Sequence, residues 1–395
     1  MTSPGRRVAM LLHNDFTTDP RVHREASALA AAGYEVTVVC LRSPGLRAEE
    51  MRDGFRILRA ADYTTAGYRR PDLMLRQRVA RSRAMREAVV GISPQVIHCH
   101  DSDTLSTGFA AARRVGARVI YDAHELLPDS FTQHPIRGSW PIRTYWRGLE
   151  RLLVPRTDAV ITVSNGLADI LHRRYGVVAT VVCNVPMLEP VVDRGLLRAD
   201  LGIPDDQIVL LYQGVLIVGR VVLPLVDVVS RFAQVALVIQ GYGPLEEEIR
   251  RRAEALGVSH RVHLMGRVEP GDLHRFACGA DIGTVLLDGI TLNHRYCRPN
   301  KLFNYFMAGL PVLATDLPEI AEIIRDTGAG QVVADNGVEA IARAVEGLVN
   351  SSELRQDMSR RARSVAETRY NWGVESEQLL RVYDRVLGHG LHAAP

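Results

Sequence analysis

Short apolar runs alternate with stretches of helical spacing along the whole chain. In the first half, the expected strands are Val8–His13, Glu35–Cys40, Val96–His100, Arg118–Asp122, Ala159–Val163 and Thr180–Cys183. Several of them are almost continuously apolar, which is typical of parallel strands covered on both faces. Helical stretches such as Arg21–Ala32, which Gly33 is suited to end, and Thr104–Val115 lie between them. The pattern predicts a doubly wound α/β unit.

The pattern weakens between Met187 and Pro204 and then starts again. The later strands are expected at Ile208–Tyr212, Ala236–Gln240, Val262–Met265, Ile282–Leu287 and Pro311–Thr315. Helices are expected at Leu245–Leu256, Leu302–Ala308 and Ala340–Val349. Since 395 residues suffice for two domains, we predict Rossmann-like domains over 1–190 and 191–370, facing each other across a cleft. Ligands of such sheets bind at the carboxyl ends of the strands, so the cleft is the expected site.

Composition narrows the class of protein. The formal net charge of +3 is too small to indicate a nucleic-acid partner. Five cysteines without a CxxC pair fit a reducing compartment, and no run approaches the roughly 20 apolar residues that span a bilayer. We therefore expect a cytoplasmic protein. Two basic, partly amphipathic stretches, Arg69–Arg86 and Trp140–Arg156, could also contact an anionic membrane surface, although such faces are usually solvated.

Lys301 is the only lysine among 48 basic side chains, the others being arginine. The chain therefore uses arginine at almost every basic position. A position that keeps lysine in such a chain favours a compact ammonium over a planar guanidinium. Lys301 follows Pro299 and Asn300 at the expected start of a helix, where free backbone N–H groups attract anions. The position predicts a phosphate contact, with chance survival of a surface lysine as the alternative.

Glycines follow two strands of the second half. Gly214 precedes Arg220, and Gly241 and Gly243 surround Tyr242 before a helix start. Small residues let a backbone approach a diphosphate, and Arg220 can supply positive charge. The second pair is not a GxGxxG dinucleotide fingerprint, because Glu246 occupies the last glycine position. Tight strand-to-helix turns are the alternative explanation.

Histidines and carboxylates end two neighbouring strands of the first half. The segments are His98–Asp101 and Tyr121–Glu125. Strand alternation places His98 and His100 on one face with one of them beside the cleft, so we expect no metal site. The alternatives are an imidazole that orients a sugar hydroxyl and hydrogen bonding at strand ends. Asn14–Asp15 and Asp19–Arg21 should form a loop over the same cleft. The expected acceptor contacts are Asn14, Asp19, Arg21, His100, Asp101 and Glu125.

Several sequence segments, in the order in which they occur, resemble those of one protein family. Arg298–Thr315 resembles the PxKLFEYMAAGLPVVAT segment of retaining GT-B glycosyltransferases of glycosyltransferase family 4. Val262–Gly266 with Asp272-Leu273 and Ala280–Ile282, Asp158–Ser164, and Arg369–Trp372 are similar to other phrases of that family. The resemblance implies a GT-B fold with a terminal helix, 371–395, that crosses back to the first domain.

The resemblance also implies site residues. The second domain would hold a sugar nucleotide and the first mainly an acceptor. Arg220 and Lys301 would contact the diphosphate, and His124 would contact the transferred sugar near its reactive carbon. The implied donor contacts are Gly214, Arg220, Gly241, Gly243, Arg267, Val268, Tyr296, Asn300, Lys301 and Asn304. The implied catalytic residues are His124, Lys301 and Arg220.

Three positions depart from the family pattern. The signature glutamates, eight positions apart, are replaced by Tyr296 and Asn304, and Val215 stands where many members place an arginine. A neutral amide at Asn304 should hold ribose hydroxyls less tightly than a carboxylate does.

We expect a retaining hexosyltransferase that uses a nucleotide diphosphate sugar, with UDP as the expected nucleotide, and a hydroxyl acceptor. Front-face departure of the leaving group fits better than a covalent glycosyl-enzyme, and no metal or other cofactor is required. A non-catalytic partner subunit that binds nucleotide sugars and a GT-B-type UDP-sugar epimerase are the alternatives.

Overall fold

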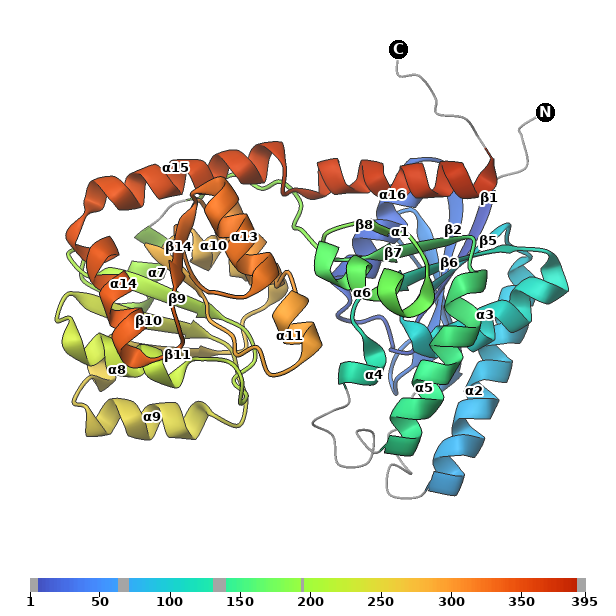
Figure 1. The fold of residues 1–395 in the computed structure, drawn as a ribbon, viewed down its shortest axis with the longest axis horizontal. Coiled ribbons are helices and arrows are strands. Elements are labelled where there is room, and N and C mark those ends of the chain that lie inside the picture. Colours follow the sequence, from blue (N-terminus) through green and yellow to red (C-terminus); the bar gives the residue numbers. More distant parts are fainter. Residues whose placement is uncertain (1–5, 63–70, 131–139, 193–194, 389–395) are drawn as a thin grey trace, which may run out of the picture. The chain divides into compact units, whose positions relative to one another are not determined.

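The computed structural model describes residues 6–62, 71–130, 140–192 and 195–388, which form two compact units. Unit 1 holds the described residues up to Val182 together with those from Ser376 onward, and unit 2 is Cys183–Glu375. We placed the boundary near residue 190; the contacts divide the chain after Val182 and after Glu375. Each unit contains a mainly parallel sheet with helices (Figure 1), which confirms the two Rossmann-like domains. The cleft between them stays a prediction.

The sheet of unit 1 has the strand order β3-β4-β2-β1-β5-β6-β7-β8. Its strands are β1 (Arg6–Leu11), β2 (Tyr34–Arg42), β3 (Glu49–Arg52), β4 (Phe55–Asp62), β5 (Val96–His100), β6 (Arg118–Ala123), β7 (Ala159–Thr162) and β8 (Ala179–Val181). Its helices are α1 (Pro20–Ala31), α2 (Pro71–Ile92), α3 (Ser102–Val115), α4 (Leu127–Ser130), α5 (Trp140–Leu153) and α6 (Asn165–Tyr175). The central strands are almost fully buried, as their continuous apolar runs predict.

One hairpin of this sheet is missing from our prediction. Strands β3 and β4 pair antiparallel around Asp53 and Gly54. Both turn residues have positive φ, 46° and 85°, as a type I′ hairpin turn requires. An Asp-Gly pair before the alternating strand Phe55–Asp62 is a strong hairpin signal, and it could have located the turn.

The sheet of unit 2 has the strand order β11-β10-β9-β12-β13-β14. Its strands are β9 (Ile208–Gln213), β10 (Val235–Gln240), β11 (Val262–Gly266), β12 (Ile282–Val285), β13 (Val312–Thr315) and β14 (Gly330–Val333). Its helices are α7 (Gly195–Leu201), α8 (Leu223–Arg231), α9 (Glu246–Ala255), α10 (Leu273–Ala277), α11 (Leu292–Tyr296), α12 (Asn300–Met307), α13 (Pro318–Thr327), α14 (Val338–Asn350) and α15 (Ser352–Thr368). Strand β14, which is short and contains the polar Gln331, was not predicted.

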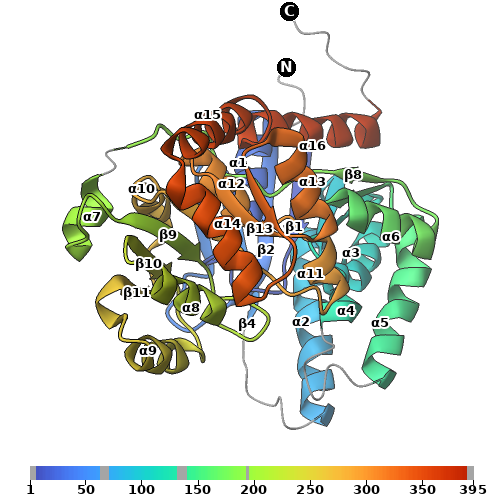
Figure 2. The same cartoon turned by 60° about the vertical axis from the view of Figure 1, so that its left-hand side comes forward.

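Helices cover both faces of this sheet. A continuous apolar core joins β9 and β10 to α8, α9 and α14. Helix α12 contacts β12, β13 and α15 (Figure 2). The carboxyl ends of β9, β10 and β12, and the first turn of α12, therefore surround the candidate donor site.

Helix α16 (Trp372–Leu387) begins in unit 2 and ends in unit 1 (Figure 1). Tyr383 is fully buried there, and its ring lies 5.5 Å from the ring of Tyr34. The hydroxyl of Tyr383 lies 2.9 Å from Nδ1 of His98. The end of the chain is thus part of the core of unit 1.

Candidate active site

Tyr305 fixes helix α12 beneath the sheet of unit 2. Its hydroxyl accepts a hydrogen bond from the Gln213 amide at 2.9 Å and donates one to the Leu211 carbonyl at 3.2 Å. Its ring lies against Gly283, where a Cβ atom would approach ring carbons to 2.4 Å. No side chain caps the start of α12, at Pro299. The free N–H groups of the first turn are thus positioned beside the strand ends.

Lys301 lies in this first turn and is 8% exposed. Its Nζ has no hydrogen-bond partner among the residues that the structure describes, and lies 4.0 Å from the centre of the Tyr212 ring. Burial lowers the pKa of Lys301, and the positive charge of Arg220 lowers it further, to about 7. In the described part of the chain, the ionisable groups that act on Lys301 are Arg220 and Cys297, neither of which is a carboxylate. This arrangement is suited to receive an anion.

The glycines of the predicted donor site let two loops approach each other. A Cβ atom at Gly241 would lie 1.9 Å from the Gly214 carbonyl oxygen, and one at Gly243 would lie 2.4 Å from the Leu216 carbonyl oxygen. The Gly214 amide donates to the Gln240 carbonyl at 3.0 Å. Contact between the loops therefore explains the glycines at 241 and 243, and the loops hold the segment that leads to Arg220.

The other predicted donor residues surround this centre on unit 2. Tyr296 ends α11, Asn300 is exposed at the start of α12, and Asn304 is half-buried on the same helix. Arg267 and Val268 follow β11, with the Arg267 guanidinium 5.9 Å from the centre of the exposed Tyr242 ring. The structure brings the predicted donor residues to the carboxyl-end edge of one sheet.

His124 follows β6 in unit 1, and its side chain is 20% exposed. Its Nε2 lies 3.1 Å from Oδ2 of Asp122, and its Nδ1 lies 3.6 Å from Oδ2 of Asp101. Burial alone would lower the pKa of His124, but these two carboxylates raise it to about 9. His124 is therefore an imidazolium at neutral pH, with one ring nitrogen held by Asp122.

Asp101 has an unusual backbone conformation, with φ of 59°. Positive φ is strained for a residue with a Cβ atom, and such strain concentrates at functional sites. The conformation lets an Asp101 carboxylate oxygen accept a hydrogen bond from the His124 amide at 3.1 Å. Burial raises the pKa of Asp101 to about 7, against the opposing effect of His124.

The remaining predicted acceptor residues divide into exposed and buried ones. Asn14 is exposed and donates to the Asp19 carboxylate at 3.0 Å, while Asp19 caps α1. Glu125 is half-buried beside His124. Arg21 was expected in a loop over the cleft, and this expectation is wrong: it lies in the first turn of α1 and is 3% exposed. His100 is also 3% exposed and faces His124, at 3.1 Å between ring nitrogens.

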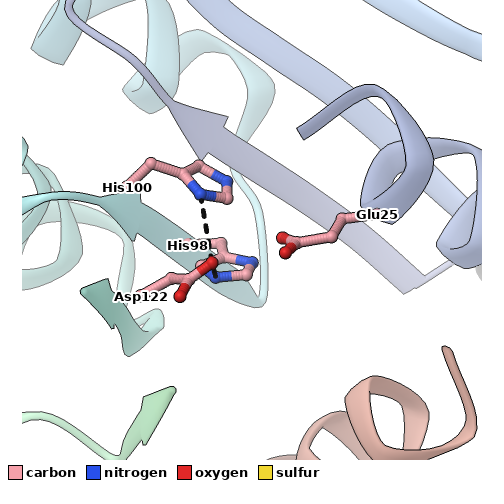
Figure 3. Close-up of side chains that lie close together, drawn as sticks. All are labelled: Glu25, His98, His100 and Asp122. Carbon is pink, nitrogen blue, oxygen red and sulfur yellow. Dashed lines mark ion pairs between the residues drawn. The ribbon is translucent and has the colours of Figure 1, made fainter. Parts of the chain in front are cut away.

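A buried cluster beneath His124 contains residues to which we assigned no role. Glu25, His98, His100 and Asp122 place potential ligand atoms within 4.8 Å of one another (Figure 3). The His98 and His100 rings stack at 4.3 Å, as expected for residues on one face of a strand. Although these are metal-binding residue types, the Arg21 guanidinium already lies 2.9 Å from Asp122 and 3.0 Å from Glu25. Arg21 thus supplies the positive charge that balances the cluster.

The sequence spacing of two of these residues, Asp122 and Glu25, could have predicted that they lie in this cluster. Asp122 precedes His124 by two positions at the carboxyl end of β6, and Glu25 follows Arg21 by one helical turn. Tyr383 had no such signal.

Comparisons with known proteins show the family of the chain. Residues 21–185 match the model described as "Glycosyltransferase Family 4", and residues 193–365 match "Glycosyl transferases group 1". The chain belongs to the group 1 glycosyltransferases. Together the two matched segments contain both candidate centres, Lys301 with Arg220 and His124 with Asp122.

Individual relatives of this glycosyltransferase are distant. A phosphatidyl-myo-inositol mannosyltransferase of Mycolicibacterium smegmatis is 24% identical, over 93% of this chain and 89% of the relative. Among solved structures, sucrose-phosphate synthase from Thermosynechococcus elongatus is similar with a TM-score of 0.81 and 16% identity, covering 97% and 99% of the two chains. Anabaena HepE in complex with UDP-glucose has a TM-score of 0.73 and 13% identity, over 96% and 99%. These structures establish the GT-B fold.

The stretch Trp140–Arg156 forms α5 and a following 3-10 turn, with Trp140 and Tyr145 exposed. Within the described residues, no helix of the glycosyltransferase is long and apolar enough to cross a membrane. Peripheral membrane contact stays a prediction. Part of the other stretch, residues 69–70, lies outside the described residues.

Lys301→Met should stabilise the nucleotide-free glycosyltransferase. Below pH 7, burial of the charged ammonium lowers the free energy of unfolding. This loss of stability becomes smaller as pH rises from about 7 toward 10.5, because the folded protein has already released the Lys301 proton that the unfolded chain still holds. We expect a stability gain on the order of 2–5 kcal/mol at or below pH 7, shrinking at higher pH. Thermal midpoints of both proteins across pH measure this, and a less stable variant at pH 7 would contradict it.

Proposed function

We propose that this glycosyltransferase moves a hexose-type sugar from a UDP-sugar to a hydroxyl acceptor with retention of anomeric configuration. The observation that carries the proposal is the unpartnered, buried Nζ of Lys301 beside Arg220, at the start of α12. A diphosphate placed there would meet two cations and the free N–H groups of a helix start. The solved complexes of HepE with UDP and with UDP-glucose support the same class of donor.

The two cations favour departure of the leaving group. Negative charge develops on the diphosphate as the glycosidic bond breaks, so Lys301 and Arg220 stabilise the transition state more than the ground state. This supports front-face departure without a covalent glycosyl-enzyme. Because arginine and lysine already supply the positive charge, we propose that no metal ion or other cofactor is required.

His124 would contact the transferred sugar. Both ring nitrogens of an imidazolium donate hydrogen bonds, and Nε2 is held by Asp122. The separation of Nδ1 from Asp101, 3.6 Å, is too long for a hydrogen bond, so Nδ1 can donate to a sugar hydroxyl. The acceptor would lie against residues of unit 1 such as the exposed Asn14 and the half-buried Glu125, which follows His124 in the chain.

Thermal protection and product analysis test this function together. Nucleotide sugars that bind the native state should raise the unfolding temperature, UDP-sugars most strongly. Incubation with the protecting UDP-sugar should then release UDP, through transfer or slow hydrolysis. Protection without release of UDP would indicate a binding subunit, and an epimerised UDP-sugar would indicate an epimerase. No protection by any nucleotide sugar would reject the donor site.

Asn304→Glu should tighten UDP binding. If ribose hydroxyls lie against this half-buried position, a carboxylate replaces neutral hydrogen bonds by charge-assisted ones, a gain of about 1–2 kcal/mol. Calorimetric titration of UDP measures the change, and Asn304→Gln controls for side-chain length without charge. Unchanged or weaker binding by Asn304→Glu would reject the ribose contact, because a carboxylate elsewhere near the phosphates can only repel them.

A further inference from the structure

The His124 imidazole is held from beneath by a carboxylate. Nε2 of His124 lies 3.1 Å from Oδ2 of Asp122, which is fully buried at the end of β6. Nδ1 of His100 lies 3.1 Å from the same Nε2. Burial lowers the pKa of His100, which is therefore neutral at pH 7. A proton on Nε2 of His124 therefore lies within hydrogen-bond distance of the Asp122 carboxylate, and Nδ1 of His100 lies 3.5 Å from Oδ2 of the same carboxylate.

Asp122 is in turn clamped by Arg21. The Arg21 Nε donates to Oδ2 at 3.0 Å, and Nη2 donates to Oδ1 at 3.0 Å and to Oδ2 at 2.9 Å. Both side chains are almost completely buried. A two-pronged guanidinium–carboxylate contact fixes the carboxylate plane as well as its position. The clamp therefore holds Oδ2 at the position where Nε2 of His124 contacts it.

Arg21 also reaches the place where the chain leaves unit 1. Its Nη1 donates to the carbonyl of Val182 at 2.9 Å, and Val182 is the last residue of unit 1 before the chain enters unit 2. Glu25 lies at the same Nε that contacts Asp122, with its Oε1 3.0 Å from that nitrogen. Burial raises the pKa of Glu25 to about 8, so Glu25 is mostly neutral at pH 7. Asp122 is thus the anion that balances Arg21.

We propose that Asp122, clamped by Arg21, is a positioning residue that fixes the orientation and the positive charge of His124. The effect of this positioning on catalysis rests on the proposed function, in which His124 contacts the transferred sugar. Fixing Nε2 on Asp122 directs Nδ1 outward as a hydrogen-bond donor. This is the relation between an orienting carboxylate and a working imidazole, in which the carboxylate never touches the substrate.

Several charged or titratable groups act on His124 besides Asp122. The described ones are Asp101, His98, His100, Arg21 and Glu25. Asp101 also raises the pKa of His124, but its carboxylate is beyond hydrogen-bond distance of Nδ1. Asp122 is the carboxylate in hydrogen-bond contact with the ring, so its removal should change both the charge and the orientation.

The decisive measurement is the titration of His124 in the full-length protein without donor. With 15N-labelled histidine, the His124 signals are assigned by their loss in His124→Gln. We expect His124 to remain an imidazolium through pH 8 in the wild type, in accord with a pKa of about 9. In Asp122→Asn, the pKa should fall toward the ordinary 6.5 or below, because the anion is lost while Arg21 remains. A wild-type His124 that titrates near 6.5 overturns the proposal even if Asp122→Asn does not fold.

Glu25→Gln is the matched control. It removes the other carboxyl group on Arg21 but no group in hydrogen-bond contact with His124, so the pKa of His124 should fall much less than in Asp122→Asn. For activity, Asp122→Asn should lower kcat about 10- to 100-fold with KM for the donor nearly unchanged, as for other supporting residues. An equal effect of both variants on the His124 titration would overturn the proposal. An expected titration combined with full turnover of His124→Ala would reject only the proposed role of His124 in transfer.

Discussion

Lys301→Ala is expected to lower turnover at saturating donor by about 10²- to 10³-fold. The variant loses a desolvated, charge-assisted contact to the leaving diphosphate, which is worth on the order of 2–4 kcal/mol in the transition state. Lys301 is only 8% exposed, so water that enters the space left by the side chain cannot stabilise the diphosphate as well as the ammonium does. Steady-state kinetics with a UDP-sugar measure the loss.

Two variants control this result. Lys301→Arg should rescue little, because the larger, planar guanidinium cannot place its charge at the buried point that the compact ammonium occupies. Arg295→Ala removes an exposed cation from α11 and should leave turnover unchanged. Near-normal turnover of Lys301→Ala would show that the phosphates bind elsewhere.

The same lysine predicts a pH dependence of donor affinity. With a pKa of about 7, Lys301 is half protonated in the free protein at pH 7, and a bound diphosphate raises that pKa. Affinity should therefore be highest below pH 7 and fall as pH rises through and above 7. A nucleotide sugar is the suitable probe, because its diphosphate has no terminal phosphate that titrates in this range. A pH-independent affinity between pH 6 and 9 would show that the ammonium does not contact the phosphates.

His124→Ala is expected to lower turnover by about 10²- to 10⁴-fold while the affinity for UDP changes little. His124 lies in unit 1, whereas the cations proposed to bind the diphosphate lie in unit 2. The imidazole is therefore expected to meet sugar rather than nucleotide. Calorimetric titration of UDP beside a kinetic assay separates the two effects.

His172→Ala provides the matched control, because His172 is an exposed histidine of the same unit. It should change neither turnover nor UDP affinity. A parallel loss of UDP affinity and turnover in His124→Ala would contradict the assignment to the sugar. It would instead indicate that His124 supports the nucleotide site.

Much of the fold could be predicted because apolar periodicity reports local burial. Strand β5 has the predicted bounds, Val96–His100, and most other strands differ from the prediction by a few end residues. Strand β4 was missed although its residues alternate, whereas the other missed strands have weak periodicity. Strand β3 contains two glutamates and an arginine, and β14 has only four residues. Pairing with a neighbouring strand, rather than an apolar face of their own, makes these segments strands.

The sequence by itself determined the alternation of strands and helices and the singular position of Lys301. Only the tertiary structure decided which side chains share the buried cluster beneath His124. Arg21 meets Asp122 across 101 positions, and Tyr383 meets His98 across 285. A local pattern reports which face of an element is buried, but not which distant charge will be buried against it. Desolvation makes an unpaired buried charge costly, so such partners are selected by the assembled core and not by neighbouring residues.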